Sequence, residues 1–244
     1  MKLVIDIGNT LTKLAVFDKD EIISSQTVEN VSKQLLSSLF ADFPKIDAAI
    51  ISSVKNLDDW IINYLSNLVK LVVLDHNTQL PYTNKYETQT TLGRDRIAAV
   101  AGAIILLPYE NTLVIDAGTC ITYDVVTAEK IYLGGGISPG IKMRFEAMHT
   151  FTGKLPLIEP EQNHHIELIG NTTKDSILSG VQNGVLEEAD GIINSYKNQF
   201  SGLKVIVTGG NYKYFDKYLK NNIFAAPNLV LIGLKKILDF NEEN

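Results

Sequence analysis

The sequence has one cysteine, no excess of basic residues and no long hydrophobic run. Cys120 has no partner within the chain, which excludes an intrachain disulfide and favours a reducing compartment. The formal net charge of −6 argues against general binding to nucleic acid or to a membrane surface. Asp6 interrupts the first apolar run, and no uncharged segment is long enough to cross a bilayer as a helix, so we expect neither a signal peptide nor a membrane span. These absences predict a cytoplasmic globular protein.

Two common nucleotide-binding motifs are also absent. No segment reads Gly-x-x-x-x-Gly-Lys-Ser/Thr, so the sequence has no P-loop. The run Gly134-Gly135-Gly136 has the wrong spacing for a Rossmann fingerprint, and no helix is expected to open on it. If this protein binds phosphate, we expect hairpin turns to do so.

The most informative feature that is present is a short signature that occurs twice. The copies are Asp6-Ile7-Gly8-Asn9-Thr10-Leu11-Thr12-Lys13 and Asp116-Ala117-Gly118-Thr119-Cys120-Ile121-Thr122-Tyr123, each preceded by Leu-Val-Ile. Glycine permits a tight turn with backbone N–H groups suited to an anion, and an aspartate at a strand end can hold a hydrated metal ion. One copy alone is most simply a capped β-turn, but two copies in equivalent positions favour hairpins that bind the phosphates of one nucleotide from both sides.

Apolar periodicity predicts an α/β protein built from two similar halves. Strands are expected at 3–7, 12–17, 22–28, 48–54, 71–74, 113–116, 121–126, 130–134 and 205–207. Helices are expected at 31–40, 57–69, 95–107, 141–149, 174–197 and 230–240. A turn-rich segment after Pro108 predicts a boundary between domains 1–110 and 111–244, with a ligand cleft between them.

Two further segments carry possible chemistry. Gly93-Arg94-Asp95-Arg96 opens a predicted helix, and an aspartate between arginines should stay ionised and could accept a proton from a substrate hydroxyl. A helix cap with solvated arginines explains the same residues. Thr208-Gly209-Gly210-Asn211 follows a buried strand, where the backbone could approach a flat ligand such as adenine; a plain loop is an equally good interpretation.

In combination these segments resemble the type III pantothenate kinases, which belong to the superfamily of acetate and sugar kinases, heat-shock chaperones and actin. The resemblance spans nearly the whole chain. It rests on 6–13, Ile51-Ser52-Ser53-Val54, Tyr86, Leu92-Gly93-Arg94-Asp95-Arg96, Ile115-Asp116-Ala117-Gly118-Thr119, Gly135-Gly136-Ile137-Ser138-Pro139-Gly140, Leu155-Pro156 and 208–211. It implies two ribonuclease-H-like domains of mixed sheet and helices with an interdomain nucleotide cleft. The implied activity is ATP-dependent phosphorylation of pantothenate to 4′-phosphopantothenate, the first step of coenzyme A biosynthesis.

The resemblance also implies roles for individual residues. Asp95 would be the catalytic base, Asp6 would hold Mg²⁺ through water, and Asp116 would help to bind a monovalent cation, K⁺ or NH₄⁺. The implied ATP-binding residues are Asp6, Ile7, Gly8, Asn9, Thr10, Leu11, Thr12, Lys13, Thr119, Gly209 and Gly210. The implied pantothenate-binding residues are Tyr86, Gly93, Arg94, Asp95, Arg96 and Thr173. The stretch 87–91 lacks the proline that the family usually carries there. This loop could therefore have a different conformation, and of the implied site residues Tyr86 is the one that this affects.

The resemblance further implies a homodimer whose pantothenate pocket is completed by the partner subunit. We expect the helix at 174–197 to contribute to the interface, because its apolar residues exceed what one narrow face requires. These residues are Ile177, Leu178, Val181, Val185, Ala189 and Ile192. The alternative is that the whole set packs within one subunit.

Two other functions remain open on the sequence alone. A different kinase on the same scaffold, such as a small sugar kinase, would call for a longer substrate insertion than this chain offers. A non-catalytic transcriptional regulator on the same fold would be favoured if Asp6, Asp95 or Asp116 were missing, and all three are present. Fold alone does not separate these functions.

Overall fold

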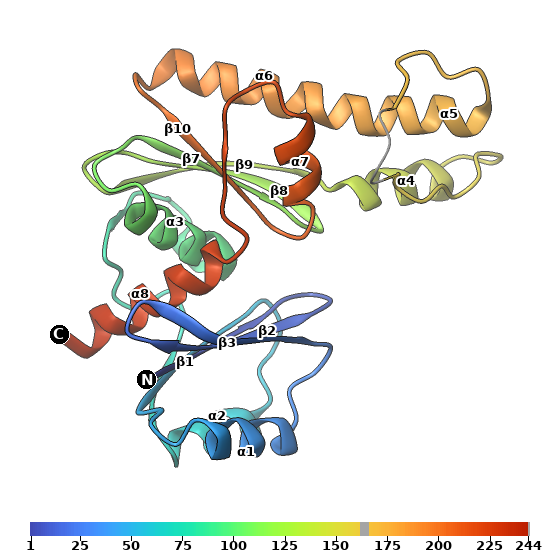
Figure 1. Cartoon of the computed structure of the whole chain (residues 1–244). Coiled ribbons are helices and arrows are strands. Elements are labelled where there is room, and N and C mark those ends of the chain that lie inside the picture. Colours follow the sequence, from blue (N-terminus) through green and yellow to red (C-terminus); the bar gives the residue numbers. More distant parts are fainter. Residues whose placement is uncertain (162–165, 244) are drawn as a thin grey trace. The chain divides into compact units, whose positions relative to one another are not determined.

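The computed structural model describes residues 1–161 and 166–243. The chain forms two compact units, each with its own mixed β-sheet and helices (Figure 1). Unit 1 contains Met1–Pro108, Lys130–Tyr132 and Asn228–Asn244, and unit 2 contains Tyr109–Glu129 and Leu133–Pro227. Within the described ranges, no helix combines the length and the apolar character needed to cross a membrane.

Unit 1 is built on a five-stranded sheet in the order β3-β2-β1-β4-β5. These strands are β1 (Lys2–Ile7), β2 (Thr12–Asp18), β3 (Glu21–Val28), β4 (Ala48–Ser53) and β5 (Lys70–Val73). Strand β2 pairs antiparallel with β1 and β3, whereas β4 pairs parallel with β1 and β5. The helices of this unit are α1 (Lys33–Asp42), α2 (Asp59–Ser66), α3 (Arg94–Leu106) and α8 (Leu229–Glu243), with a 3₁₀ turn at Gln89–Thr91.

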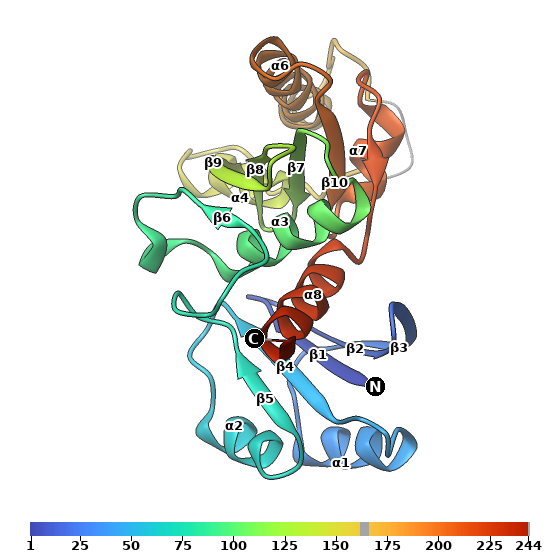
Figure 2. The same cartoon turned by 90° about the vertical axis from the view of Figure 1, so that its left-hand side faces the viewer.

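The faces of this sheet follow from the alternation of side chains along β1. Leu3 and Ile5 belong to the core that the sheet forms with α1 and α2. Because successive side chains of a strand point to opposite faces, Asp6 emerges on the other face. Helices α1 and α2 lie on one side of the sheet and α8 on the other (Figure 2). The carboxylate of Asp6 is therefore on the side away from α1 and α2.

Helix α8 packs closely on α3 through two glycines. A Cβ atom at Gly102 would lie 2.4 Å from the Leu229 carbonyl oxygen, and one at Gly233 would lie 1.7 Å from the Ala98 carbonyl oxygen. The sequence-based division placed all of 111–244 in the second domain. In the structure α8 is instead part of unit 1, because its buried face packs on α3 and beside β1 and β4.

Unit 2 repeats the strand order of unit 1. Its strands are β7 (Thr112–Ala117), β8 (Cys120–Val126), β9 (Ile131–Pro139, of which the first two residues belong to unit 1), β10 (Lys204–Thr208) and β11 (Phe224–Ala225). Their order, β9-β8-β7-β10-β11, matches β3-β2-β1-β4-β5, with β7–β8 antiparallel and β7–β10 and β10–β11 parallel. A short strand β6 (Thr83–Asn84) pairs with Ile131 and Tyr132 of β9. The chain thus contains two ribonuclease-H-like domains.

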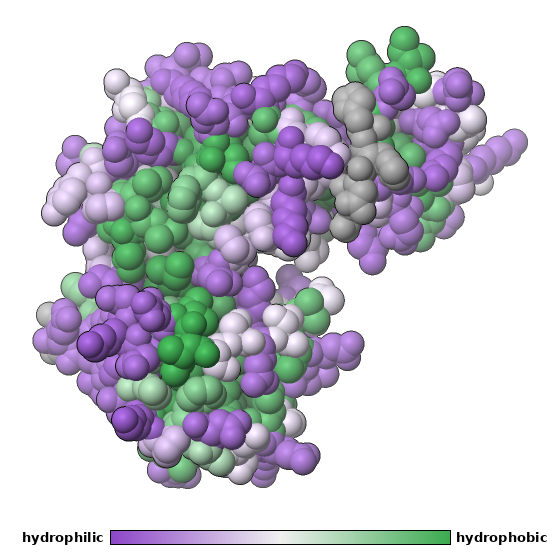
Figure 3. Space-filling model, viewed as in Figure 1, coloured by the Kyte–Doolittle hydropathy of each residue, from purple (hydrophilic) through white to green (hydrophobic). Residues whose placement is uncertain are grey.

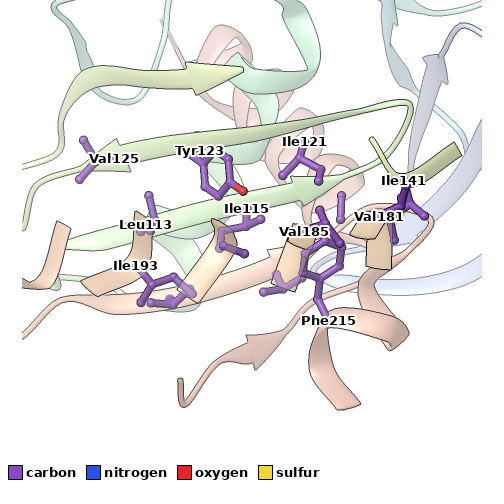
Figure 4. Close-up of a cluster of buried hydrophobic side chains, with 14 of the residues drawn as sticks. Leu113, Ile115, Ile121, Tyr123, Val125, Ile141, Val181, Val185, Ile193 and Phe215 are labelled. Carbon is purple, nitrogen blue, oxygen red and sulfur yellow. The ribbon is translucent and has the colours of Figure 1, made fainter. Parts of the chain in front are cut away.

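The helices of unit 2 enclose a core on one face of its sheet. They are α4 (Ile141–Thr150), α5 (Thr173–Leu178), a π-helical turn at Ser179–Asn183, α6 (Gly184–Gln199) and α7 (Tyr212–Tyr218). Ile115 and Ile121 of the strands face Val181 and Val185 of the long helical run (Figure 4). The predicted helix at 174–197 is therefore present, with a π turn in it.

That core corrects one argument from the sequence. Ile177, Leu178, Val181, Val185 and Ala189 are each at most 5% exposed within the single chain, and Ile192 packs against the same core. The inference that this helix has apolar residues to spare for a partner was wrong, because the core of its own unit takes all of them.

Several elements differ from the prediction. Strands β6 and β11 have two residues each and leave no periodic pattern, and α7 has only seven residues. Strand β9 continues to Pro139 instead of ending near 134. Gly135 permits this because a Cβ atom there would fall 1.5 Å from the Tyr123 carbonyl oxygen of β8.

Candidate active site

A row of three side chains crosses the sheet of unit 1 at the end of β1. Asp6 is paired in register with Lys13 on β2 and with Ser52 on β4, so the three residues share one face. Ser52 is fully buried. Its hydroxyl is near enough to lower the pKa of Asp6, yet Oγ makes no hydrogen bond of good geometry. The structure thus sets a carboxylate between a cation and a buried hydroxyl.

Asp95 completes this group from the first turn of α3. Burial, and after it the charge of Asp95, raise the pKa of Asp6 to about 6, against the opposing effects of Lys13 and Ser52. Two carboxylates that interact in this way favour a cation near them, because each disfavours the ionised form of the other. Perturbed pKa values of this origin are common at functional sites.

The segment 93–96 has the geometry of a helix start with close packing. The backbone N–H of Arg96 donates to Asp95 Oδ1 at 2.8 Å, and the Arg94 guanidinium donates to the carbonyl oxygen of Ser53 at the end of β4. A Cβ atom at Gly93 would lie 2.5 Å from Asp95 Oδ1, so a side chain at this position would displace the carboxylate. The backbone of this segment therefore starts a helix, as one of the two interpretations of the sequence expects. The charge of Asp95 in addition raises the pKa of Asp6.

Tyr86 lies in this group even though the usual proline is missing. The Arg96 guanidinium carbon lies 5.4 Å from the Tyr86 ring centroid, and the ring stacks on Tyr132 at 6.2 Å with 12° between the planes. Arg96 is itself 5% exposed. Tyr86 thus contacts the helix start that contains Gly93, Arg94, Asp95 and Arg96.

A cavity of about 220 Å³ opens beside these residues. Gly93 and Arg94 line it from α3, Ser53 and Val54 line it from the end of β4, and His76 lines it from the loop after β5. It is large enough for part of a small polar substrate.

The β1–β2 turn uses its glycine differently from the expectation. The Gly8 N–H donates to the Leu11 carbonyl oxygen at 3.0 Å and so closes the hairpin. Asn9, Thr10 and Leu11 are exposed at the tip of the turn. The residues whose backbone could meet an anion are therefore 9–11, because the Gly8 amide already has an acceptor.

Ile7 and Thr12 are not on the face of Asp6. They are paired in register across the hairpin and line a separate cavity of about 130 Å³ with Lys55 and Asn56. Thr12 is 2% exposed. Of the predicted ATP-binding residues in this hairpin, Asp6 and Lys13 share one face of the sheet and Ile7 and Thr12 the other.

Unit 2 contains an equivalent row at the end of β7. Asp116 is paired in register with Thr122 on β8 and with Thr208 on β10. Gly209 follows Thr208 with φ +90°, and a Cβ atom there would lie 2.4 Å from Asp116 Oδ1. The backbone N–H of Asn211 donates to the Ala117 carbonyl oxygen at 2.9 Å. Of the predicted glycine pair, Gly209 thus lies directly against the predicted cation ligand.

The β7–β8 turn is tied to the start of α4. Gly118 N–H closes the turn on the Cys120 carbonyl oxygen at 2.9 Å, and Thr119 is exposed at its tip. The Gly140 N–H donates to the Thr119 carbonyl oxygen at 3.1 Å. The predicted residues Thr119, Gly209 and Asp116 are therefore brought into one region of unit 2.

A cavity of about 290 Å³ lies beside Gly210. Gly210, Asn211 and Tyr214 line one part of it, and Gln182 lines another. Thr173, the remaining predicted site residue, is exposed in the first turn of α5, where Thr172 caps the helix by accepting from the Asp175 N–H at 3.1 Å.

Sequence reasoning gave no role to Ser52, Thr208 or Gly140. Ser52 and Thr208 each flank an aspartate in register, and Gly140 supports the β7–β8 turn. All three stand in segments that carry the resemblance, and this was the only signal that could have found them.

Comparison with known sequences decides the family. The sequence profile described as type III pantothenate kinase matches residues 2–195. The type III pantothenate kinase of Christiangramia forsetii is 46% identical over 243 residues, with 99% of each chain covered. The enzyme of the same name from Phocaeicola vulgatus is 42% identical over 244 residues, with 100% of each chain covered. The chain belongs to the type III pantothenate kinase family.

Solved structures with the same fold belong to proteins that are described as having different functions. A crystal structure described as a Baf family transcriptional activator from Campylobacter jejuni has a TM-score of 0.64, is 22% identical and covers 99% of this chain and 100% of its own. A ROK family glucokinase from Streptomyces griseus has a TM-score of 0.53 at 13% identity, with 100% of this chain and 99% of its own covered. At such identities the likeness establishes the fold alone. Membership of the pantothenate kinase family makes this chain a kinase, which uses ATP and a divalent metal ion, and favours neither the regulator nor the sugar kinase.

Proposed function

We propose that this protein transfers the γ-phosphoryl group of ATP to the primary hydroxyl of pantothenate, giving 4′-phosphopantothenate for coenzyme A synthesis. Membership of the family supports the substrate. The observation that carries the chemistry is the pair of carboxylates, Asp6 and Asp95: burial and the charge of Asp95 together raise the pKa of Asp6.

In this proposal Asp95 is the general base. Phosphoryl transfer has a loose transition state, so the base accepts the hydroxyl proton late and catalysis comes mostly from position and charge neutralisation. The N-terminal end of α3 and the close packing of Gly93 hold the Asp95 carboxylate in one orientation. Lys13, in register with Asp6, adds positive charge on the same face.

Asp6 is the residue that would hold Mg²⁺ through water. Carboxylate oxygen is a preferred ligand of this ion, and the raised pKa of Asp6 means that a nearby cation relieves an electrostatic conflict. When bound, Mg²⁺ supplies positive charge that neutralises the phosphoryl oxygens.

Pantothenate would be bound by Tyr86, Gly93, Arg94 and Arg96. The 220 Å³ cavity next to Gly93 offers space beside the proposed base, and the Arg94 and Arg96 side chains are both anchored by contacts of their own. Fixed cationic groups suit the carboxylate end of pantothenate, because they need no reordering when the substrate binds.

ATP would be bound by the two hairpin turns and by the glycine pair. Residues 9–11 and Thr119 would meet the phosphates through exposed turn backbone. The cavity of about 290 Å³ beside Gly210 would take the adenosine, with Tyr214 offering an aromatic surface. Asp116 would hold a monovalent cation, K⁺ or NH₄⁺, which supplies charge that a P-loop lysine provides in other kinases.

The proposed enzyme is a cytoplasmic homodimer in which Thr173 of the partner subunit completes the pantothenate pocket. Hydrophobic atoms gather on the loop before α5 (Figure 3), where Leu168 is 78% and Ile169 is 85% exposed. Exposed apolar side chains in one place suit a protein interface. This loop, and not the apolar face of α5 and α6, is the surface that supports a dimer.

The test is ATP consumption by the purified protein with pantothenate, pantetheine, glucose and N-acetylmannosamine as acceptors. The proposal expects turnover with pantothenate, and turnover at least about 100-fold lower with both sugars, because a site built for one set of polar groups leaves its own groups unpaired with another. Turnover with a sugar alone would favour the sugar kinase. Nucleotide binding without turnover on any acceptor would favour the regulator.

A further inference from the structure

One segment of the family pattern has no role in the proposal above. Gly135-Gly136-Ile137-Ser138-Pro139-Gly140 forms the end of β9 and the residue that precedes α4. Its last residue touches the β7–β8 turn, since a Cβ atom at Gly140 would lie 2.3 Å from the Thr119 carbonyl oxygen and 2.5 Å from that of Gly118. The Gly140 N–H also donates to the Thr119 carbonyl oxygen at 3.1 Å. Gly140 is therefore in direct contact with the turn.

Three side chains from three elements hold the residues just before Gly140. Arg144 of α4 donates through Nε to the Pro139 carbonyl oxygen at 2.8 Å and through Nη2 to Ser138 Oγ at 2.8 Å. The same Nη2 lies 2.7 Å from Glu188 Oε2 of α6, and Ser138 Oγ donates to Glu188 Oε1 at 2.6 Å. We name these residues, Ser138, Arg144 and Glu188, the Ser138 network.

The Ser138 network is better shielded than other ion pairs on the same helices. The Arg144 and Glu188 side chains are 21% and 30% exposed, whereas those of the neighbouring pair Lys142–Glu146 are 72% and 53% exposed. Burial and the charge of Glu188 also raise the pKa of Tyr123, whose side chain lies in the core of unit 2 (Figure 4). A shielded arginine fork with several partners fixes geometry as well as charge.

We propose that the Ser138 network positions the β7–β8 turn for the phosphates of the nucleotide, acting through Pro139 and Gly140. Arg144 is the positioning residue, because among the three residues of the network it is the one that donates to the Pro139 carbonyl oxygen, next to Gly140. The inference rests on the proposed role of the Thr119 turn in binding ATP. Backbone donors assist phosphoryl transfer only when they are already oriented, so a small shift of the turn weakens nucleotide binding and leaves pantothenate binding unchanged.

The test compares five single variants and one double variant with the wild-type protein. Arg144→Met and Glu188→Gln disrupt the Ser138 network. Lys142→Met and Glu187→Gln are matched controls, because they remove exposed pairs, with Glu146 and Lys220, on the same two helices. For each protein, calorimetric titration gives the Kd for ADP, steady-state kinetics give KM for ATP and for pantothenate, and a thermal melt gives Tm.

We expect Arg144→Met to raise the Kd for ADP and the KM for ATP about 10-fold or more, with KM for pantothenate unchanged. Glu188→Gln should act in the same direction, and both controls should stay within twofold of wild type. Arg144→Lys should recover little, because an ammonium group does not reproduce the fork.

A double variant distinguishes an effect on the position of the β7–β8 turn from an effect on the stability of the protein. Arg144→Glu with Glu188→Arg restores an ion pair between α4 and α6, but glutamate at 144 cannot donate to the Pro139 carbonyl oxygen. We expect Tm to recover towards wild type while the Kd for ADP stays high. Recovery of both, or equal ADP affinity in Arg144→Met and Lys142→Met, would overturn the proposal, as would a wild-type protein that binds no ADP. ADP titration needs no acceptor. If the wild-type protein did not phosphorylate pantothenate, the proposed function would be wrong, but the ADP affinities of the variants would still test the role of the Ser138 network.

Discussion

Asp6 at the end of β1 and Asp95 at the start of α3 are electrostatically coupled. The pKa of Asp6 is raised to about 6 by burial and by the charge of Asp95, and the opposing effects of Lys13 and Ser52 do not cancel this rise. A protein without a bound cation therefore keeps a strained ionised group near neutral pH. Such a conflict is expected where a site is arranged for a metal and a phosphate and not for stability.

The first prediction concerns stability without added Mg²⁺. Because the pKa of Asp6 is raised in the folded state, its favourable contribution is complete below about pH 4 and is lost as the pH rises through about 6. Asp6→Asn should therefore raise the free energy of unfolding at pH 8, by up to about 3 kcal/mol for a shift of about two pKa units, and the gain should vanish near pH 4. Urea unfolding at pH 8, 6 and 4 measures this difference.

Asp75 provides an opposite control in the same unit. Burial raises the pKa of its carboxyl, but hydrogen bonds from the backbone of Asn77 and from Thr78 outweigh burial and lower the pKa overall. Asp75→Asn should reduce stability at pH 8, and its effect should shrink as the pH falls below about 4. If Asp6→Asn reduced stability at pH 8 as Asp75→Asn is expected to do, the electrostatic account of Asp6 would be wrong.

The second prediction compares two neighbouring glycines. Gly209 has φ +90° and no room for a Cβ atom beside Asp116, whereas nothing lies within 4 Å of a Cβ atom at Gly210. Gly209→Ala should lower the free energy of unfolding by at least about 1–2 kcal/mol and weaken ADP binding, because it strains the backbone and displaces Asp116. Gly210→Ala should retain wild-type stability. Denaturant titration and ADP calorimetry on both variants check this, and equal stability of the two would contradict it.

The third prediction concerns the monovalent cation. If Asp116 holds K⁺ or NH₄⁺, the rate should be low in Na⁺ or in a bulky organic cation and should recover with K⁺ or NH₄⁺. Asp116→Ala should abolish that response. Steady-state rates at constant ionic strength measure the effect, and equal rates of the wild-type protein in all four salts would rule the cation site out.

The fourth prediction concerns the shared pocket. Asp95→Asn and Thr173→Arg should each be inactive alone, and mixing the two should restore activity, because in a mixed dimer one site has neither substitution. Sedimentation at micromolar concentration should show a dimer. A fully active monomer would exclude sharing, while a dimer without recovery on mixing would remove Thr173 from the pocket.

The repeated signature made much of this structure predictable. Two Leu-Val-Ile runs followed by aspartate and glycine predicted two equivalent hairpins, and the observed sheets share one strand order. The residues paired with each aspartate were harder to predict from the sequence. Ser52 lies 46 residues from Asp6 in the sequence, and the register of β4 against β1 leaves no local pattern. Periodicity also gave α8 a buried face without showing that α3 covers it. Likewise, no composition rule reveals that the Gly8 amide closes its own turn.

The most direct test of the central claim is the formation of 4′-phosphopantothenate from ATP and pantothenate, followed by mass spectrometry with wild-type protein and with Asp95→Asn. The account predicts steady product formation by wild type. It predicts that Asp95→Asn folds, binds ADP with nearly wild-type affinity and forms product about 10²–10⁴-fold more slowly, because only the proton acceptor is lost. No product from wild type, or wild-type turnover by a correctly folded Asp95→Asn, would contradict it.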